Sequence, residues 1–580
     1  MKAMPILRLA FTLALLAALG APAAAGVAPL DAPLPGSNLP DLLPSALPVE
    51  APLPSPPVMP GWPQTMGTVV PYSPVGVVLA DIEGDGDLEV IAGSTDSKLY
   101  LWDHDGVLRA GWPVTMPGQV QSKAAVADLD GDGVLEILVA VKNGQLHILH
   151  ADGTSLAGWP QTSGVTFGFL SPSVYDLDAD GTPEVMLGGG STLRVWNADG
   201  TLRSGWPQTV AGTISGTLAI GDVVGDATPE IFAVSTSKNL YGFAADGTAL
   251  SGFPIFFNLS NSYAAPSIGD LDGNGTREVC VVGYNFGVSS SIFAYEGDGS
   301  AVPGFPVSTP SSQTYSCPVL GDMDGDGDLE LFNAGKVTGN TLFAWDHTGA
   351  LLPGWPQLGD PNMEGSVILA DFDGAGPLEM AVADNNGPGV IFGHNLDGTV
   401  AAEFPIAKPG FSGPNSPALG DVDGDGDLDM AMTTADGSVT LWDFAAPWDA
   451  DKVEWGTLFH DDWNTNQHGF VVPGGDLTAV DDSPVAAFAL VGAHPNPLSA
   501  GGVSTLTFTL RRSASLRLSV HDATGRRVRV LAEGLRGPGE HVARWDGHDD
   551  AGKSCPAGVY LLSLETADGA RRTAKLTVLR

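Results

Sequence analysis

A nine-residue acidic motif that recurs eight times constrains the fold of this chain more than any other feature. The copies begin at Asp81, Asp128, Asp176, Asp222, Asp270, Asp322, Asp371 and Asp421, and we number them acidic loops 1 to 8. Successive copies begin 46 to 52 residues apart. A period near 50 residues, with short apolar stretches on both sides of each copy, is typical of a propeller or a similar array.

A second motif follows the same period. It reads Gly-Trp-Pro, Gly-Phe-Pro or Glu-Phe-Pro, and it begins at Gly61, Gly111, Gly158, Gly205, Gly252, Gly304, Gly354 and Glu403. Between the two motifs runs a short apolar stretch that ends in an aromatic residue, as in LYLW up to Trp102. Each repeat therefore predicts four short strands: one ending at the leading acid, one starting at the closing acid, one ending at the aromatic residue, and one carrying the Gly-Trp-Pro motif. The fold class expected is all-β.

The order of the two motifs predicts how the array closes. The first Gly-Trp-Pro, at Gly61, precedes acidic loop 1, and none follows acidic loop 8. The N-terminal strand could therefore complete the last blade, which would leave no open edge. We expect an eight-bladed β-propeller over 59–470, with seven blades as the alternative if a degenerate repeat lies outside the ring.

The spacing of acids within each loop is typical of a calcium site. Acids or amides stand at positions 1, 3, 5 and 9, and glycine at position 6 allows a sharp turn. Calcium takes six to eight oxygen ligands, and position 7 would add a backbone carbonyl. An EF-hand differs, because its closing acid stands at position 12 and helices flank it. The alternative is a set of acidic turns without an ion, since Asp and Gly are common in turns. Carboxylates this close repel one another unless a cation lies among them.

We expect about six Ca²⁺ sites and no other cofactor. Loops 4 and 7 are expected to bind weakly or to be empty, because loop 4 has Val224 and Ala227 at positions 3 and 6, and loop 7 has Ala375 at position 5. The predicted ligands in the six other loops are Asp81, Glu83, Asp85, Asp87, Glu89, Asp128, Asp130, Asp132, Val134, Glu136, Asp176, Asp178, Asp180, Thr182, Glu184, Asp270, Asp272, Asn274, Thr276, Glu278, Asp322, Asp324, Asp326, Asp328, Glu330, Asp421, Asp423, Asp425, Asp427 and Asp429.

Two other groups of residues admit two interpretations. The aromatic residues of the second motif could bind a ligand, but their repetition at the blade period favours core packing between blades. The stretch 454–469 breaks the repeat and contains His460, Asp461, Asp462 and His468. It could hold a metal, although a cap packed on the last blade is the preferred interpretation. We find no catalytic residues in a recognisable motif, so an enzyme is not expected.

Charge and the N-terminal sequence indicate the compartment and exclude one class of partner. The chain has 67 Asp and Glu against 26 Lys and Arg, a formal net charge of −41, which argues against binding nucleic acid. Residues 1–25 resemble a secretory signal peptide, with early positive charge, an apolar run and small residues before the expected cut. A proline-rich linker is expected over 26–58. No transmembrane segment is expected, and three distant cysteines could form one disulfide at most.

The C-terminal part has a different composition. After a linker over 471–490, alternating stretches such as STLTFTL from Ser504 and VYLLSLE from Val559 predict about seven short strands over 491–580. A region of that size with so many strands indicates a small Ig-like β-sandwich.

Both parts resemble known families. The DxDGDGxxE loops, their strand context and the Gly-Trp-Pro period resemble the FG-GAP/VCBS repeats of integrin-α-like β-propellers. That resemblance implies calcium in the blade loops and roles in adhesion or recognition; some relatives carry enzymes. The tail, with HPNP from His494, DATGRRV from Asp522 and PAGVYLLSL from Pro556, is similar to the FlgD Ig-like domain and to the sorting domain of type IX secretion. It implies a bacterial protein that is secreted, held at the cell surface or associated with the outer membrane.

Three functions are consistent with these features. The first is a calcium-binding propeller, secreted or at the cell surface, that recognises an extracellular protein or glycan. The second is an enzyme acting on extracellular polysaccharide, which a deep pocket with convergent polar residues outside the acidic loops would favour. The third is a structural part of an envelope assembly, attached through the C-terminal domain.

Overall fold

The chain folds into β-sheets throughout the described residues. The computed structural model describes residues 56–67, 76–261, 264–309, 313–336, 340–361, 363–472, 488–494, 498, 503–510, 514–521, 526–536, 539–549, 553–566 and 571–579. The expected signal peptide, nearly all of the proline-rich linker and most of the second linker lie outside these residues. The described residues contain one short 3-10 helix, η1 (Ala450–Lys452), and otherwise strands, so the all-β prediction is confirmed.

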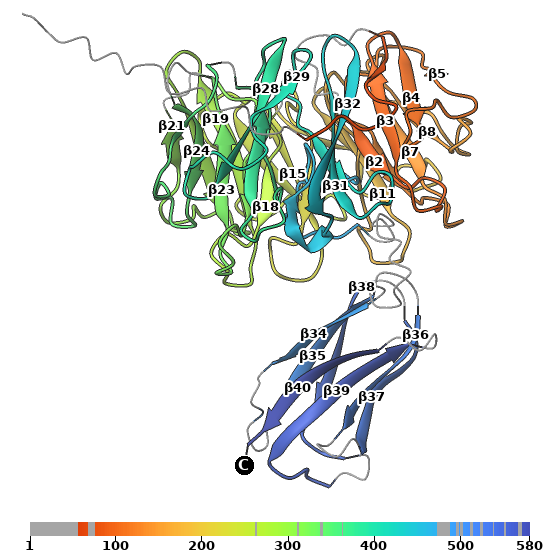
Figure 1. Cartoon of the computed structure of the whole chain (residues 1–580), viewed down its shortest axis with the longest axis vertical. Helices are drawn as coiled ribbons and strands as arrows, with labels where there is room; N and C mark the ends of the chain where they lie inside the picture. The colour runs from red at the N-terminus through yellow and green to blue at the C-terminus, as the bar shows by residue number, and fades with distance from the viewer. Residues whose placement is uncertain are drawn as a thin grey trace, which may run out of the picture. The chain divides into compact units, whose positions relative to one another are not determined.

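Each repeat forms one antiparallel sheet of four strands in sequence order (Figure 1). Sheet 1 contains β2 (Val78–Ala80), β3 (Glu89–Ser94), β4 (Lys98–Trp102) and β5 (Val114–Thr115). Sheets 2 to 4 contain β6 (Ala125–Ala127), β7 (Glu136–Val141), β8 (Gln145–Leu149) and β9 (Gln161–Thr162); β10 (Ser173–Tyr175), β11 (Glu184–Gly189), β12 (Thr192–Trp196) and β13 (Gln208–Thr209); and β14 (Ala219–Gly221), β15 (Glu230–Ser235), β16 (Asn239–Ala244) and β17 (Ile255–Phe256).

The remaining repeats form sheets 5 to 8 with the same order. Sheets 5 and 6 contain β18 (Ser267–Gly269), β19 (Glu278–Asn285), β20 (Ser289–Tyr295) and β21 (Val307–Thr309), then β22 (Val319–Gly321), β23 (Glu330–Ala334), β24 (Asn340–Trp345) and β25 (Gln357–Leu358). Sheet 7 contains β26 (Ile368–Ala370), β27 (Glu379–Ala383), β28 (Gly389–Asn395) and β29 (Ile406–Lys408), with β33 (Val453–Trp455) added beside β26. Sheet 8 contains β30 (Ala418–Gly420), β31 (Asp427–Thr433) and β32 (Ser438–Pro447).

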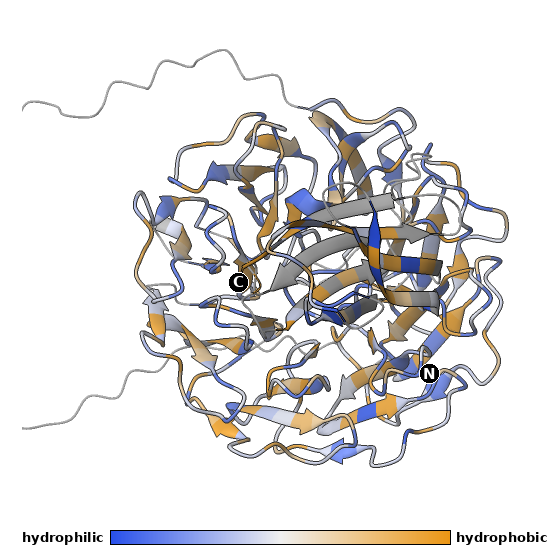
Figure 2. Cartoon of the chain, turned by 90° about the horizontal axis from the view of Figure 1, so that it is seen from below, coloured by the Kyte–Doolittle hydropathy of each residue, from blue (hydrophilic) through white to orange (hydrophobic). Residues whose placement is uncertain are grey.

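The N-terminal strand completes sheet 8, as the order of the motifs predicts. Strand β1 (Gln64–Thr65) pairs with β32, with Gln64 opposite Val439. Even the end of the expected linker takes part, because Val58 forms a bridge with Trp442. A buried cluster joins sheets 8 and 1 and includes Trp62, Val90 and Leu441. Further buried clusters join each other sheet to the next around the ring, and hydrophobic stretches recur from sheet to sheet in Figure 2.

The aromatic residues of the Gly-Trp-Pro motifs pack between sheets, as expected. Trp159 is buried, lies edge-on to Trp196 of the next sheet with 6.0 Å between ring centroids, and donates from Nε1 to the carbonyl of Ala198 at 2.8 Å. The motif itself is not part of the fourth strand, contrary to the prediction; the fourth strand begins just after the proline. The glycine explains this, since Gly205 has a φ of +87° and an added Cβ would lie 1.9 Å from the carbonyl oxygen of Asp246. The motif is therefore a turn that meets the next sheet.

An inner segment, residues 452–468, follows the first strands of the sheets. First strands of neighbouring sheets contact one another, which places them at the centre of the ring. Backbone N–H groups in or beside the first strands of sheets 2, 3, 4, 5, 7 and 8 donate to carbonyl oxygens of this segment, namely Val126 to Asp462, Val174 to Trp463, Ile220 to Thr465, Ile268 to Asn466, Asp371 to Lys452 and Leu419 to Gly456. The segment was expected to pack on the last blade, but it contacts most of the ring.

The C-terminal part is a sandwich of two sheets. One contains β34 (Phe488–His494), β35 (Ser504–Leu510) and β38 (Gly539–Trp545), and the other β37 (Arg527–Arg536), β36 (Ala514–His521), β39 (Gly558–Thr566) and β40 (Arg571–Val578). One core joins them, in which Trp545 lies edge-on to Tyr560 at 5.1 Å. The prediction of about seven strands is confirmed. The three cysteines are buried and form no disulfide, so no disulfide holds either part together.

We predict that the indole of Trp159 stabilises the ring through both packing and its hydrogen bond. Trp159→Ala should lower the free energy of unfolding by about 3–5 kcal/mol, because it leaves a cavity between sheets. Trp159→Phe should cost about 1–3 kcal/mol, because the Ala198 carbonyl loses its donor. Phe253 fills the equivalent position of another repeat and serves as the natural precedent. Urea unfolding followed by circular dichroism measures both. A Trp159→Phe variant as stable as the unaltered chain would contradict the role of the hydrogen bond, and equal stability of the two variants would contradict the role of packing.

Candidate metal centres in the acidic loops

The acidic loops connect the first and second strands of each sheet, which places position 1 just after one strand and position 9 on the next. In loop 6, Asp322 accepts hydrogen bonds at Oδ1 from the backbone N–H of Gly325 (2.7 Å) and at Oδ2 from that of Gly327 (3.1 Å). Both glycines have a positive φ. The predicted turn residue was the glycine at position 6 alone, whereas position 4 has left-handed backbone as well. Ala179 takes this conformation at position 4 of loop 3, and Ala227 takes it at position 6 of loop 4.

The closing acid makes the same hydrogen bond in all eight loops. One carboxylate oxygen accepts from the backbone N–H of position 2 at 2.7–2.9 Å, in the pairs Glu89–Ile82, Glu136–Leu129, Glu184–Leu177, Glu230–Val223, Glu278–Leu271, Glu330–Met323, Glu379–Phe372 and Asp429–Val422. Every closing acid is buried. This bond leaves the second carboxylate oxygen of each closing acid available for other contacts.

In loops 2 to 5 the acids converge on a common centre. In loop 5, single oxygens of Asp270, Asp272 and Glu278 lie within 4.8 Å of one another. The same holds for Asp176, Asp178 and Glu184 in loop 3, and for Asp128, Asp130 and Asp132 in loop 2. Loop 4, which we expected to be weak, still brings Asp222, Asp226 and Glu230 together. Whether loops 4 and 7 bind weakly therefore stays a prediction.

Several of these oxygens are buried and accept no hydrogen bond within the described residues. They are Oδ1 of Asp270, Oε1 of Glu278, Oδ1 of Asp371, and Oδ1 of Asp421 and of Asp423. A buried anionic oxygen without a donor is costly unless a cation lies beside it. The residues present in loops 5, 7 and 8 therefore fit a hard cation such as calcium, for which acid and amide oxygens are the preferred ligands.

Burial and mutual repulsion raise the pKa of the closing acids. Burial is the largest cause, the neighbouring carboxylates add to it, and the backbone hydrogen bond opposes it. The pKa rises to about 8 for Glu89, Glu278 and Asp429, to about 7 for Glu184, Glu330 and Glu379, and to about 6 for Glu230, and it is also raised for Glu136. A site that disfavours its own ionised carboxylates is one that a bound cation would stabilise.

Position 7 and position 5 form a local turn. The backbone N–H of position 7 donates to the side-chain oxygen of position 5, as Thr182 does to Asp180 at 2.8 Å and Thr276 to Asn274 at 2.8 Å. The same bond recurs at Asp87, Val134, Asp328 and Asp427. The role of the position 7 carbonyl as a ligand stays a prediction.

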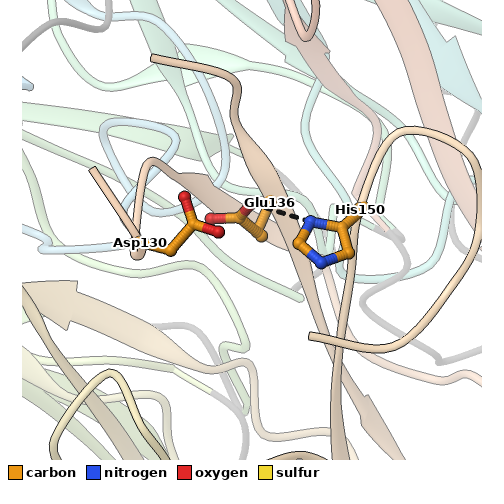
Figure 3. A group of neighbouring side chains, drawn as sticks. All are labelled: Asp130, Glu136 and His150. Atoms are coloured by element: carbon orange, nitrogen blue, oxygen red, sulfur yellow. Dashed lines mark hydrogen bonds and ion pairs between the residues drawn. The ribbon is translucent and has the colours of Figure 1, made fainter. Parts of the chain in front are cut away.

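Sequence reasoning missed residues that approach the loops from the third strand and the turn after it. In loop 2, Nδ1 of His150 lies 3.1 Å from Oε1 of Glu136, and Asp130 lies on the other side of that carboxylate (Figure 3). In loops 1 and 3, Arg109 and Arg203 contact the acids. The signal was present, because His150 directly follows the third strand and both arginines stand two residues before a Gly-Trp-Pro glycine.

A hollow of about 320 Å³ lies beside the inner segment and reaches Asp81 of loop 1. Its lining includes Asp451, Glu454, Thr457, His460, Asp461 and Asp462. Nδ1 of His460 lies 2.9 Å from Oδ2 of Asp461, and His468 pairs instead with Glu454. Of the four residues considered as a metal group, only His460 and Asp461 pair with each other, because Asp462 lies 3.8 Å from Nζ of Lys123 and His468 pairs with Glu454.

Comparison with known proteins identifies both parts of the chain. Residues 81–139, 128–187, 270–333 and 371–432 match the FG-GAP-like repeat, and residues 496–570 match the FlgD Ig-like domain. The chain therefore carries FG-GAP-like repeats and a C-terminal FlgD Ig-like domain. No curated protein matches it in sequence. Among the described residues, no helix is long and apolar enough to cross a membrane.

Three solved structures are similar to part of this chain at low sequence identity. BamB from Moraxella catarrhalis has a TM-score of 0.44 and 13% identity, covering 66% of this chain and all of that one. BBS1N, solved in complex with ARL6DN, has a TM-score of 0.40 and 13% identity over 68% of this chain and all of that one. Sqt1 of Saccharomyces cerevisiae has a TM-score of 0.48 and 11% identity over 67% of this chain and 99% of that one.

The raised pKa values predict that the metal-free protein loses stability as the pH rises. The pKa of Glu278 is about 8 in the folded chain against an ordinary value of 4.5. Its contribution to stability is therefore complete below pH 4.5 and is lost as the pH rises toward 8, at about 1.4 kcal/mol per pKa unit. In chelator, the melting temperature should fall between pH 5 and pH 8. Glu278→Gln should show a shallower fall, and an unchanged slope in that variant would contradict the assignment.

Proposed function

We propose that this chain is a calcium-binding recognition protein whose propeller is stabilised by ions in its acidic loops. The observation that supports it most directly is the set of buried carboxylate oxygens without donors, of which Asp270 and Glu278 supply two in one loop. Bound calcium would supply positive charge among these oxygens and fix the loop geometry. The loops would thereby rigidify a fold in which the cysteines form no disulfide.

Recognition of an extracellular protein or glycan is the function we assign to the propeller. The supporting features are the FG-GAP-like repeats and the closely spaced loops that the eight sheets present at the ends of their short strands. Loops held on a rigid scaffold are the usual place for binding residues. The net charge of −41 is consistent with a partner other than nucleic acid.

An enzyme remains the second candidate. The observation that favours it is the hollow beside the inner segment, where the carboxylate of Asp461 fixes the orientation of His460 and also accepts from the backbone N–H of Trp463 at 2.9 Å. A histidine oriented by a carboxylate is the arrangement of a general base. The substrate class would be extracellular polysaccharide.

Calcium should bind to the full chain and raise its melting temperature. Titration calorimetry on chelator-treated protein should show several equivalents bound, and excess calcium should raise the melting temperature by mass action. The double variant Asp324→Asn/Asp326→Asn should bind one equivalent fewer, because loop 6 loses two carboxylates. Asp199→Asn, in an exposed turn outside the loops, is the control. Absence of both heat and a melting shift in the unaltered chain would refute the calcium proposal.

The recognition proposal is tested with the calcium-loaded protein and the chelator-treated protein. The full chain is offered to immobilised extracellular polysaccharides and surface proteins, with calcium or with chelator. We expect a partner that is bound in calcium and released by chelator. Cleavage of a polysaccharide that is lost in His460→Ala would instead favour the enzyme.

We also propose that the protein is secreted and that the C-terminal FlgD Ig-like domain attaches it to the cell surface. The supporting features are the expected signal peptide and the independent core of the sandwich around Trp545. Deleting residues 485–580 should release the protein into the medium, as measured by cell fractionation. Unchanged surface retention would contradict attachment through this domain, and surface retention abolished together with a defective envelope would favour a structural role.

A further inference from the structure

One repeat position separates the acidic loops into two kinds. It stands two residues before the first residue of each Gly-Trp-Pro-type motif. Its backbone N–H donates to a carbonyl on the preceding strand in every repeat, as Arg109 does to Leu101 and Leu352 does to Ala344. The position is thus structurally equivalent throughout the ring. It is apolar in six repeats, as Met59, Leu156, Leu250, Val302, Leu352 and Ala401, and it is arginine in two, as Arg109 and Arg203.

Both arginines reach the acids of their own loop. Arg203 contacts Asp178 through Nη2 (2.9 Å) and Glu184 through Nη1 (2.5 Å). Those residues are positions 3 and 9 of loop 3. Arg109 makes the equivalent pair of contacts in loop 1, with Glu83 at position 3 and with Glu89 at position 9, the latter at 3.1 Å. It also contacts Asp103 at 2.6 Å.

The contrast is clearest at the second oxygen of the closing acid. Oε1 of Glu184 and of Glu89 each receives a guanidinium nitrogen, whereas Oε1 of Glu278 in loop 5 is buried and accepts no hydrogen bond within the described residues. The planar guanidinium matches carboxylate geometry and stays protonated. It therefore supplies a guanidinium charge to loops 1 and 3, whereas loop 2 has the imidazole of His150 beside Glu136, and no arginine stands at this position in the other repeats.

We propose that loops 1 and 3 are held by an arginine of the chain in place of calcium, so that calcium binding is confined to the loops whose equivalent residue is apolar. The proposal rests on the calcium-binding function proposed above. It reduces the complete loops available to calcium from six to four, namely loops 2, 5, 6 and 8. The propeller would then keep part of its loop structure when calcium is withdrawn.

The test counts bound ions and follows stability in the full chain. Equilibrium dialysis with atomic absorption should give about two more ions in Arg109→Leu/Arg203→Leu than in the unaltered chain, and about one more in each single variant. Leucine is the residue found at this position in other repeats, so the substitution suits the backbone. Lys142→Leu, which removes one charge from an exposed lysine bonded to Gln119, is the control for each single variant.

A variant that introduces an arginine into another repeat tests the same proposal in the opposite direction. Leu352 lines a hollow with Asp322 and Asp324 of loop 6, so Leu352→Arg places a guanidinium beside a complete loop. It should bind one ion fewer than the unaltered chain. In chelator, the double arginine variant should melt several degrees lower than Lys142→Leu, because the acids of loops 1 and 3 lose their counter-charge.

The outcomes separate the two proposals. If no variant binds calcium, the calcium proposal fails, and the melting of the double variant in chelator still decides whether the arginines stabilise the metal-free loops. If the unaltered chain binds calcium but neither the arginine variants nor Leu352→Arg changes the number of ions, the confinement proposed here is overturned and the calcium proposal stands.

Discussion

The hydrogen bond from the backbone N–H of position 2 to the closing acid is the interaction on which the rest of the propeller depends. It occurs in all eight repeats, including those in which other acids of the loop are replaced. It joins the end of the first strand to the start of the second and fixes the turn between them. Because the acid is buried at the edge of the hydrophobic cluster, the bond also brings a charged group next to the core.

That placement explains why the chain has so many acids and why they need a counter-charge. Thirty-two of the 67 acids lie in the eight loops. A carboxylate with one oxygen bonded to the backbone and the other in a group of acids is unstable alone. The repeats meet this requirement differently: Arg203 in loop 3, His150 in loop 2, and no side chain of the described residues at Oε1 of Glu278. The hydrogen bond between position 2 and the closing acid is the same in all repeats, whereas the group that contacts the second carboxylate oxygen differs from loop to loop.

The sequence alone predicted features that depend on local spacing. The acids at positions 1, 3, 5 and 9, the packing of Trp159 and the completion of sheet 8 by Gln64 and Thr65 could all be inferred, because each depends on a repeated interval. The role of Arg109 could not, since it lies 20 residues beyond Glu89 and meets it only when the third strand has folded back. The contacts of the inner segment with most of the ring were not predicted either. Its hydrogen bonds run from backbone to backbone, and no side-chain pattern records them.

The pairing of β1 with β32 has a consequence for how the chain folds. Six of the eight propeller sheets consist only of strands that are consecutive in sequence, so each of these can form soon after its residues are available. Sheet 8 needs Gln64 and Val439 together, and the inner segment follows still later along the chain. A chain that ends before residue 438 would lack β32, so that the cluster covering Leu79 and Trp102 of sheet 1 would be without Val439 and Leu441. Incomplete chains would therefore expose apolar surface and would be prone to aggregation and proteolysis. Only chains that close the ring would bury this surface.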